Sequence, residues 1–200
     1  MTELTGVHRD ALIEATVDEF ATAGYEAASL NRIIRAAGIS KSSFYHAVSS
    51  KAELFDAVIS ALISDVQARW RPPAPTAFSG AAFWPTLDEV LAQLGALTAD
   101  DRSLTLLGRV FHLPATGESD ARGRMLAGIR RWVGEVLQVG AASGAVRDDV
   151  ATDALAAAVF GMLRGLDEWA LADDTDAAAA ASAAHAPAIL LRGLLTPPAR

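Results

Sequence analysis

Residues 29–46 read SLNRIIRAAGISKSSFYH, and this stretch decides the fold. The apolar residues of its first half recur with helical spacing and stop at Gly38, which predicts a helix of about eight residues over 30–37. Ser40 then stands where an N-cap belongs and predicts a second helix over 41–46. Two short helices that meet across a glycine-containing turn predict a helix-turn-helix.

Longer helices flank this stretch. A helix over 7–24 precedes it, because its apolar residues share one face: Ile13, Val17 and Phe20. The sequence SKAE at 50–53 is a capping box, in which the serine hydroxyl and the glutamate carboxylate each satisfy a backbone N–H. It predicts a helix that begins there and runs to about Trp70, where RPPAP at 71–75 breaks it.

The rest of the chain carries helical spacing without strand-like alternation. We expect five further helices, over 82–97, 101–111, 119–142, 149–171 and 176–195. Pro187 lies inside the last of these and is expected to kink it. The expected fold is therefore all-α, with about nine helices.

Charge is unevenly distributed along the chain. The formal net charge is -7, yet no Asp or Glu occurs between Ala27 and Ala52. His46 can add to the four positive charges of this segment, which are Arg32, Arg35, Lys41 and Lys51. Such a segment predicts a local basic surface on an acidic protein, and its plain alternative is an ordinary solvated face.

Composition narrows the class of protein. The chain has no cysteine, no apolar run long enough to span a membrane and no export signal in residues 1–5, so we expect a cytoplasmic protein without a membrane partner. The histidines are too scattered to predict a metal site, and no phosphate-binding glycine loop or nucleophile elbow is present. We therefore expect no enzyme activity and no cofactor.

The stretch 29–46, followed by SKAEL at 50–54, resembles the TetR family of transcriptional regulators. The resemblance rests on AGIS at the turn, on Phe44 and Tyr45 late in the second short helix, and on the start of the next helix; Val48 departs from the phenylalanine that is usual there. It implies a helix-turn-helix DNA-binding domain over 1–50, a connecting helix over 51–71, and a ligand-binding and dimerisation domain over 72–200.

A recognition helix in the major groove presents its first turn to base edges, while flanking residues contact phosphates. Lys41, Ser42 and Ser43 are the expected base readers, and Tyr45, His46 and Lys51 can donate to phosphates; for Tyr45 and Lys51 the resemblance implies the same role. Singly, each residue also has an ordinary role in packing, capping or solvation. The full set of predicted DNA-contacting residues is Arg32, Ser40, Lys41, Ser42, Ser43, Tyr45, His46 and Lys51.

An apolar pocket with polar anchors is expected between the helices of the second domain. Plain core packing is the alternative for each of these residues. The predicted ligand-binding residues are Trp84, Leu87, Phe111, His112, Met125, Ile129, Trp132, Phe160 and Arg164.

The sequence therefore predicts a ligand-responsive regulator, a repressor that a small apolar effector releases from a palindromic operator. Its expected partners are double-stranded DNA, an unidentified small-molecule effector and a second copy of the chain, paired through helices 149–171 and 176–195 with Leu191 and Leu194 at the interface. The alternative is an all-helical small-molecule-binding or interaction protein without operator binding.

Overall fold

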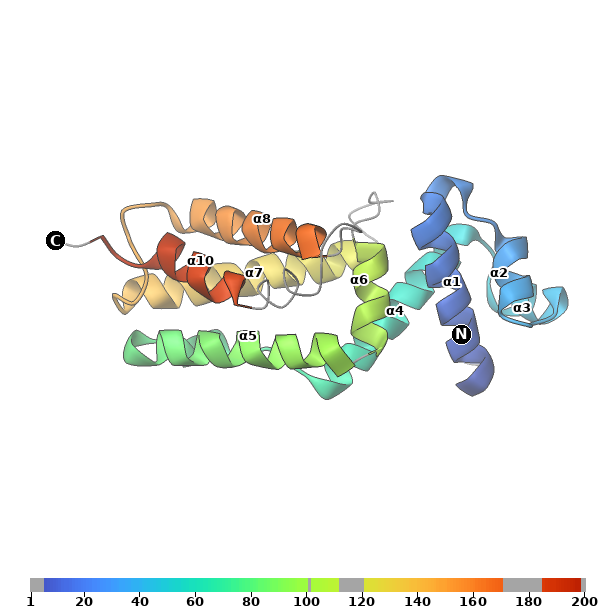
Figure 1. The fold of residues 1–200 in the computed structure, drawn as a ribbon, viewed down its shortest axis with the longest axis horizontal. Helices are drawn as coiled ribbons and strands as arrows, with labels where there is room; N and C mark the ends of the chain where they lie inside the picture. Colours follow the sequence, from blue (N-terminus) through green and yellow to red (C-terminus); the bar gives the residue numbers. More distant parts are fainter. Residues whose placement is uncertain (1–5, 101, 112–120, 171–184, 199–200) are drawn as a thin grey trace. The chain divides into compact units, whose positions relative to one another are not determined.

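A computed structural model describes residues 6–100, 102–111, 121–170 and 185–198 of the chain (Figure 1). Within these ranges the regular structure is helical throughout, with two short 3₁₀ helices at Pro75–Ala77 and Gly80–Ala82. The prediction of an all-α fold with about nine helices is confirmed. The α-helices are α1 (Gly6–Ala27), α2 (Leu30–Ala36), α3 (Lys41–Ala47), α4 (Lys51–Arg69), α5 (Phe83–Asp100), α6 (Arg102–Phe111), α7 (Ala121–Ala142), α8 (Thr152–Ala170) and α10 (Ala186–Leu195).

The chain divides into two compact units. Unit 1 comprises Met1–Arg71 and Asp100–Leu126, and unit 2 comprises Pro72–Ala99 and Ala127–Arg200. Unit 1 therefore holds α1 to α4 together with α6, and α7 begins in unit 1 and continues into unit 2.

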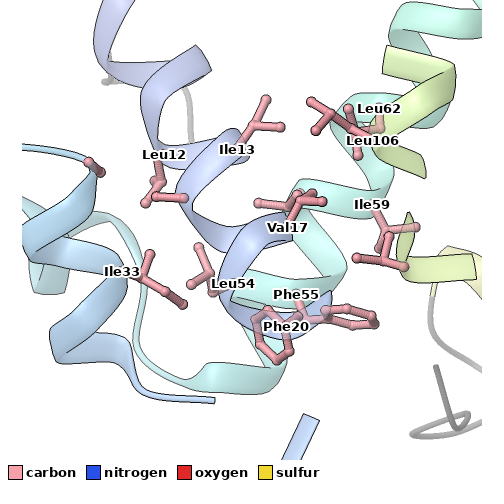
Figure 2. Close-up of a cluster of buried hydrophobic side chains, with 14 of the residues drawn as sticks. Leu12, Ile13, Val17, Phe20, Ile33, Leu54, Phe55, Ile59, Leu62 and Leu106 are labelled. Atoms are coloured by element: carbon pink, nitrogen blue, oxygen red, sulfur yellow. The ribbon is translucent and has the colours of Figure 1, made fainter. Parts of the chain in front are cut away.

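Unit 1 is organised around one apolar core formed mainly by α1, α4 and α6. Figure 2 shows Val17 and Phe20 of α1 directed toward side chains of α4. The ring of Phe20 lies 4.8 Å from that of Phe55, centroid to centroid, and both side chains are buried. Burying a side chain of this size stabilises a fold by about 1.5–3 kcal/mol. The inward face predicted for α1 is confirmed, because Ile13, Val17 and Phe20 are all buried.

Two glycines set the geometry of the turns in unit 1. Gly24 has φ of 73° and interrupts α1, so the predicted end of the first helix is a kink, and one further turn runs on to Ala27. Gly38 has φ of 65° and lies between α2 and α3. Both backbones occupy the left-handed region, which residues with a Cβ rarely adopt.

The cap of α4 differs from the prediction in one bond. The Ser50 hydroxyl accepts from the N–H of Glu53 at 3.1 Å, as expected. The Glu53 carboxylate, however, accepts from the N–H of Ser49 at 2.8 Å. The Ser49 hydroxyl donates to the same carboxylate oxygen, and this second donor favours the shifted arrangement.

Unit 2 contains α5, most of α7, α8 and α10, and α10 packs against α8 (Figure 1). On α10, the side chains of Leu191 and Leu195 are buried. Pro187 lies in the first turn of α10, where its missing N–H costs no hydrogen bond. The predicted helical residues 176–184 lie outside the described ranges. None of the described helices combines the length and the apolar character that crossing a membrane requires.

Candidate DNA-binding site

Helix α3 is oriented by one cap and one buried ring. Ser40 has an extended backbone, and its hydroxyl accepts from the N–H of Ser43 at 3.0 Å, which makes it a true N-cap. Phe44 on the opposite side is fully buried in the core of unit 1. Because 3.6 residues make one turn, this pair of constraints leaves the first turn of α3 facing solvent.

The exposed side of α3 carries most of the predicted DNA-contacting residues. Lys41 and Ser42 are exposed in its first turn, and His46 is exposed one turn later. Tyr45 is 51% exposed, with its ring edge-on to that of Phe44. These residues can therefore approach a ligand together.

The two remaining serines of this group are already bonded to each other. The hydroxyls of Ser40 and Ser43 lie 2.8 Å apart, and Ser40 also caps the helix. Among the predicted base readers, Lys41 and Ser42 are therefore the ones whose side chains are not used in holding α3.

Lys51 opens α4 and reaches back to the end of α1. Its Nζ donates to the carbonyl oxygen of Glu26 at 2.8 Å and lies 5.0 Å from the centre of the Tyr25 ring. The lysine side chain thus links the first residue of α4 to the turn that follows the kink at Gly24.

Arg32 lies in the acid-free segment 27–52, yet it is paired with a carboxylate from outside that segment. Its Nε donates to both carboxylate oxygens of Glu19 at 2.9 Å, and its Nη2 donates to the carbonyl of Ala27 at 3.0 Å. The hydrogen bonds from Arg32 hold the pKa of Glu19 below its usual value. Glu19 lies on α1, thirteen positions before Arg32, so no local pattern could have revealed this pair.

The predicted ligand-binding residues that the structure describes have several different surroundings. Trp84 and Trp132 belong to one chain of edge-on rings, through Phe83 and Phe78, and the Trp132 Nε1 donates to the carbonyl of Pro73 at 2.9 Å. Leu87 is half-buried, whereas Ile129 and Arg164 are exposed.

Met125 and Phe160 make other contacts. Met125 packs on the core of unit 1. Phe160 lines a groove of about 490 Å³ between α7 and α8, where the Arg130 guanidinium lies 4.6 Å from the ring centre. The side chain of Phe111 and all of His112 lie outside the described parts of the structure. Among the described residues predicted to bind a ligand, Phe160 is the one that lines this groove.

Residues 12–58 match the family model of the bacterial regulatory proteins of the tetR family. This range covers α2, α3 and the turn between them, together with the adjoining parts of α1 and α4. No curated protein matches the chain in sequence.

Solved structures with the same fold span nearly the whole chain. A TetR regulator family member from Streptomyces coelicolor A3, SCO3833, is 25% identical, with a TM-score of 0.63 over 92% of this chain and 90% of that one. NalD, the secondary repressor of the MexAB-OprM multidrug efflux pump in Pseudomonas aeruginosa, is 19% identical, with a TM-score of 0.64 over 94% and 96%. The regulator FadR from Bacillus subtilis, solved with stearoyl-CoA, is 16% identical, with a TM-score of 0.64 over 91% and 96%. The segment over residues 12–58 thus matches the tetR family of bacterial regulatory proteins, and the whole chain shares its architecture with solved TetR family regulators.

Proposed function

We propose that the chain is a ligand-responsive transcriptional repressor that places α3 in the major groove of a palindromic operator. The observation that carries this proposal is the capped first turn of α3, where Lys41 and Ser42 are exposed while Phe44 anchors the opposite side. A rigid, short helix with polar side chains in its first turn is what reading of base edges requires.

Lys41 and Ser42 are the proposed base readers, because lysine donates to guanine O6 or N7 and serine can bond to several base edges. Tyr45, His46 and Lys51 are the proposed phosphate contacts, since Tyr45 and His46 are exposed later on α3 and the half-buried Lys51 opens α4. Phosphate contacts position the protein on the duplex, whereas base contacts select the sequence.

A palindromic operator requires two copies of the chain. On α10, Ile189 is 68% exposed and Leu190 is 45% exposed, which supports a homodimer through this helix and α8. Leu191, expected at the interface from the sequence, is buried within its own chain and 3% exposed. We therefore place Ile189 and Leu190 in the proposed dimer contact.

Residues 72–200 are the proposed ligand-binding and dimerisation region, joined to residues 1–50 by the helix over 51–71. An apolar effector is supported by the ring chain that contains Trp84 and Trp132, and by the groove beside Phe160. FadR, which shares this fold, was solved with an acyl-CoA. An effector that prefers one arrangement of the dimer weakens operator binding by the same factor by which DNA weakens effector binding.

Binding of purified protein to a duplex that it selects from a random DNA pool tests the proposal. Lys41→Ala and Ser42→Ala should change sequence preference by about 1–3 kcal/mol, if each contacts a base edge. Lys51→Glu should weaken binding to all duplexes, because it removes a contact that does not read sequence.

Amine labelling supplies an independent footprint, since Lys41 and Lys51 are the only lysines in the sequence. The selected duplex should protect both from acetylation. A wild-type chain that selects no sequence, with both lysines equally acetylated in the presence of DNA, would favour the alternative of a helical small-molecule-binding protein.

A further inference from the structure

We propose that Glu19 and Arg32 form a clamp that positions the helix-turn-helix for operator reading, with Arg32 acting through Glu19 instead of on a phosphate. The clamp consists of the Glu19 carboxylate, the Arg32 guanidinium, the N–H of Ser29 and the carbonyl of Ala27. This inference rests on the operator binding proposed above and assigns the role of one of its predicted contacts.

The clamp replaces the missing cap of α2. Ser29 is the N-cap residue, yet its hydroxyl makes no capping bond. In a capping box, the third helical residue is Glu or Gln and accepts from the N–H of the cap residue. Here that third residue is Arg32, and the carboxylate comes instead from Glu19 on α1, which accepts from the Ser29 N–H at 2.8 Å.

Arg32 completes the arrangement from the other side. It binds Glu19 through Nε and Nη2, and its Nη2 also donates to Ala27 in the last turn of α1. A positive charge in the first turn of a helix is unfavourable by itself, and the adjacent carboxylate offsets that cost. One guanidinium thereby ties the start of α2 to both the middle and the end of α1.

Geometry makes this contact important for reading DNA. Helix α2 has seven residues and is followed after Ala37, Gly38, Ile39 and Ser40 by α3, so the angle at which α2 begins fixes where α3 points. Arg32 already commits Nε and Nη2 to this arrangement, so a two-bond phosphate contact through them would require it to release Glu19, whose side chain is only 13% exposed. A largely covered carboxylate without its partner is costly, and this favours the clamp over the phosphate.

Three variants of the full-length protein test the clamp: Glu19→Gln, Arg32→Gln and the double variant. Affinity for the selected operator should fall about fivefold in each single variant, the value of one net hydrogen bond, with no additional loss in the double variant. Affinity for a random duplex should stay unchanged, and so should the slope of log affinity against log salt. The matched control is Asp65→Asn, which breaks a different ion pair of α1, between Asp65 of α4 and Arg9 at 3.0 Å, and should leave the ratio of operator to random affinity unchanged.

Arg32→Lys separates the two roles most sharply. Lysine keeps the charge and serves a phosphate well, but it cannot bind both Glu19 oxygens and Ala27 as the planar guanidinium does. The clamp predicts that Arg32→Lys loses operator affinity like Arg32→Gln. Retained affinity in Arg32→Lys, with a salt slope lowered by about 1 in Arg32→Gln, would overturn the clamp and assign Arg32 to a phosphate.

Hydrogen exchange of the free protein supplies a readout without DNA. Exchange at the amides of Ser29 and of α2 should accelerate in Glu19→Gln and not in Asp65→Asn. Unchanged exchange in Glu19→Gln would overturn the clamp whether or not the protein binds an operator. A wild-type chain that prefers no duplex, with accelerated exchange in Glu19→Gln, would instead contradict the proposed function and leave the clamp standing.

Discussion

Unit 1 and unit 2 bury their apolar side chains to different degrees. Nine of the twelve largest fully buried side chains lie in unit 1, and they form one continuous core with α1, α4 and α6 (Figure 2). Among the residues that the structure describes, the exposed large apolar side chains of unit 2 are Ile129, Val150, Trp169, Ile189 and Leu190, whereas unit 1 exposes Tyr45.

This contrast separates two ways of stabilising a helical unit. Unit 1 covers most of its large apolar side chains with its own helices. Unit 2 leaves apolar surface at several positions, which a second copy or a ligand can cover. The predictions below test each side of this comparison.

The largest effect is expected from Phe20→Ala. Phe20 is fully buried between the rings of Tyr25 and Phe55, so its removal leaves a cavity at the centre of unit 1. Unfolding free energy should fall by about 3–5 kcal/mol, as measured by urea denaturation. Tyr45→Ala is the control, since an exposed aromatic side chain should cost less than about 0.5 kcal/mol. Equal losses in the two variants would show that unit 1 does not depend on this core.

The double variant Ile189→Glu with Leu190→Glu should yield monomers. Both positions are exposed in the single chain and would be buried in the dimer. Charges placed there should weaken association by about 2–4 kcal/mol, and sedimentation velocity measures the change. Leu191→Ala is the matched control on the same helix: it should lower stability through a cavity while the subunits stay paired. A dimer that survives the double variant places the interface elsewhere.

Two glycines of α7 should respond to alanine with opposite sign. A Cβ on Gly140 would meet Phe83 Cε2 and Val146 Cγ2, each at 2.6 Å, so Gly140→Ala should destabilise unit 2 by about 1–3 kcal/mol. A Cβ on Gly134 meets no atom within 4 Å, so Gly134→Ala should stabilise the helix by about 0.5–1 kcal/mol. Thermal unfolding compares the two, and a stabilising Gly140→Ala would show that Phe83 packs less closely there.

The smallest effect on stability is expected when the pH is lowered. Arg32 lowers the pKa of Glu19 below its ordinary 4.5, and the Ser49 hydroxyl and N–H lower that of Glu53. A carboxyl group with a lowered folded pKa contributes stability above its unfolded pKa, and that contribution is lost as pH falls through the folded value. Urea midpoints should therefore decline as pH falls from about 6 to below about 4. Glu19→Gln should show a shallower decline, and an identical decline would mean that this carboxyl group does not contribute.

Short-range patterns account for what could be predicted. The serine at position 40, the glycine at 38 and the helical spacing around Phe44 act within one or two turns, so α2, α3 and the start of α4 were predicted to within about a residue. The kink at Gly24 also follows from local chemistry, although the extra turn beyond it does not. Residues such as Lys41 and Ser42 could be selected from the sequence because an exposed first turn follows directly from the cap and the period.

Contacts between distant segments required the tertiary structure. The segment 27–52 contains no acid, and its sequence therefore predicts four unopposed cations, yet folding brings Glu19 onto Arg32 and the carbonyl of Glu26 onto Lys51. The predicted ligand-binding residues likewise divide between the units, because Met125 packs against the core of unit 1 while the Trp132 indole donates to the carbonyl of Pro73 in unit 2. By itself the sequence determined the helices around the turn at Gly38, the serine caps of α3 and α4 and the buried face of α1, since hydrogen bonds and side-chain period act over a few residues. Which charges are paired, and which aromatic side chains meet, was decided by packing between helices that lie far apart along the chain, where no local period applies.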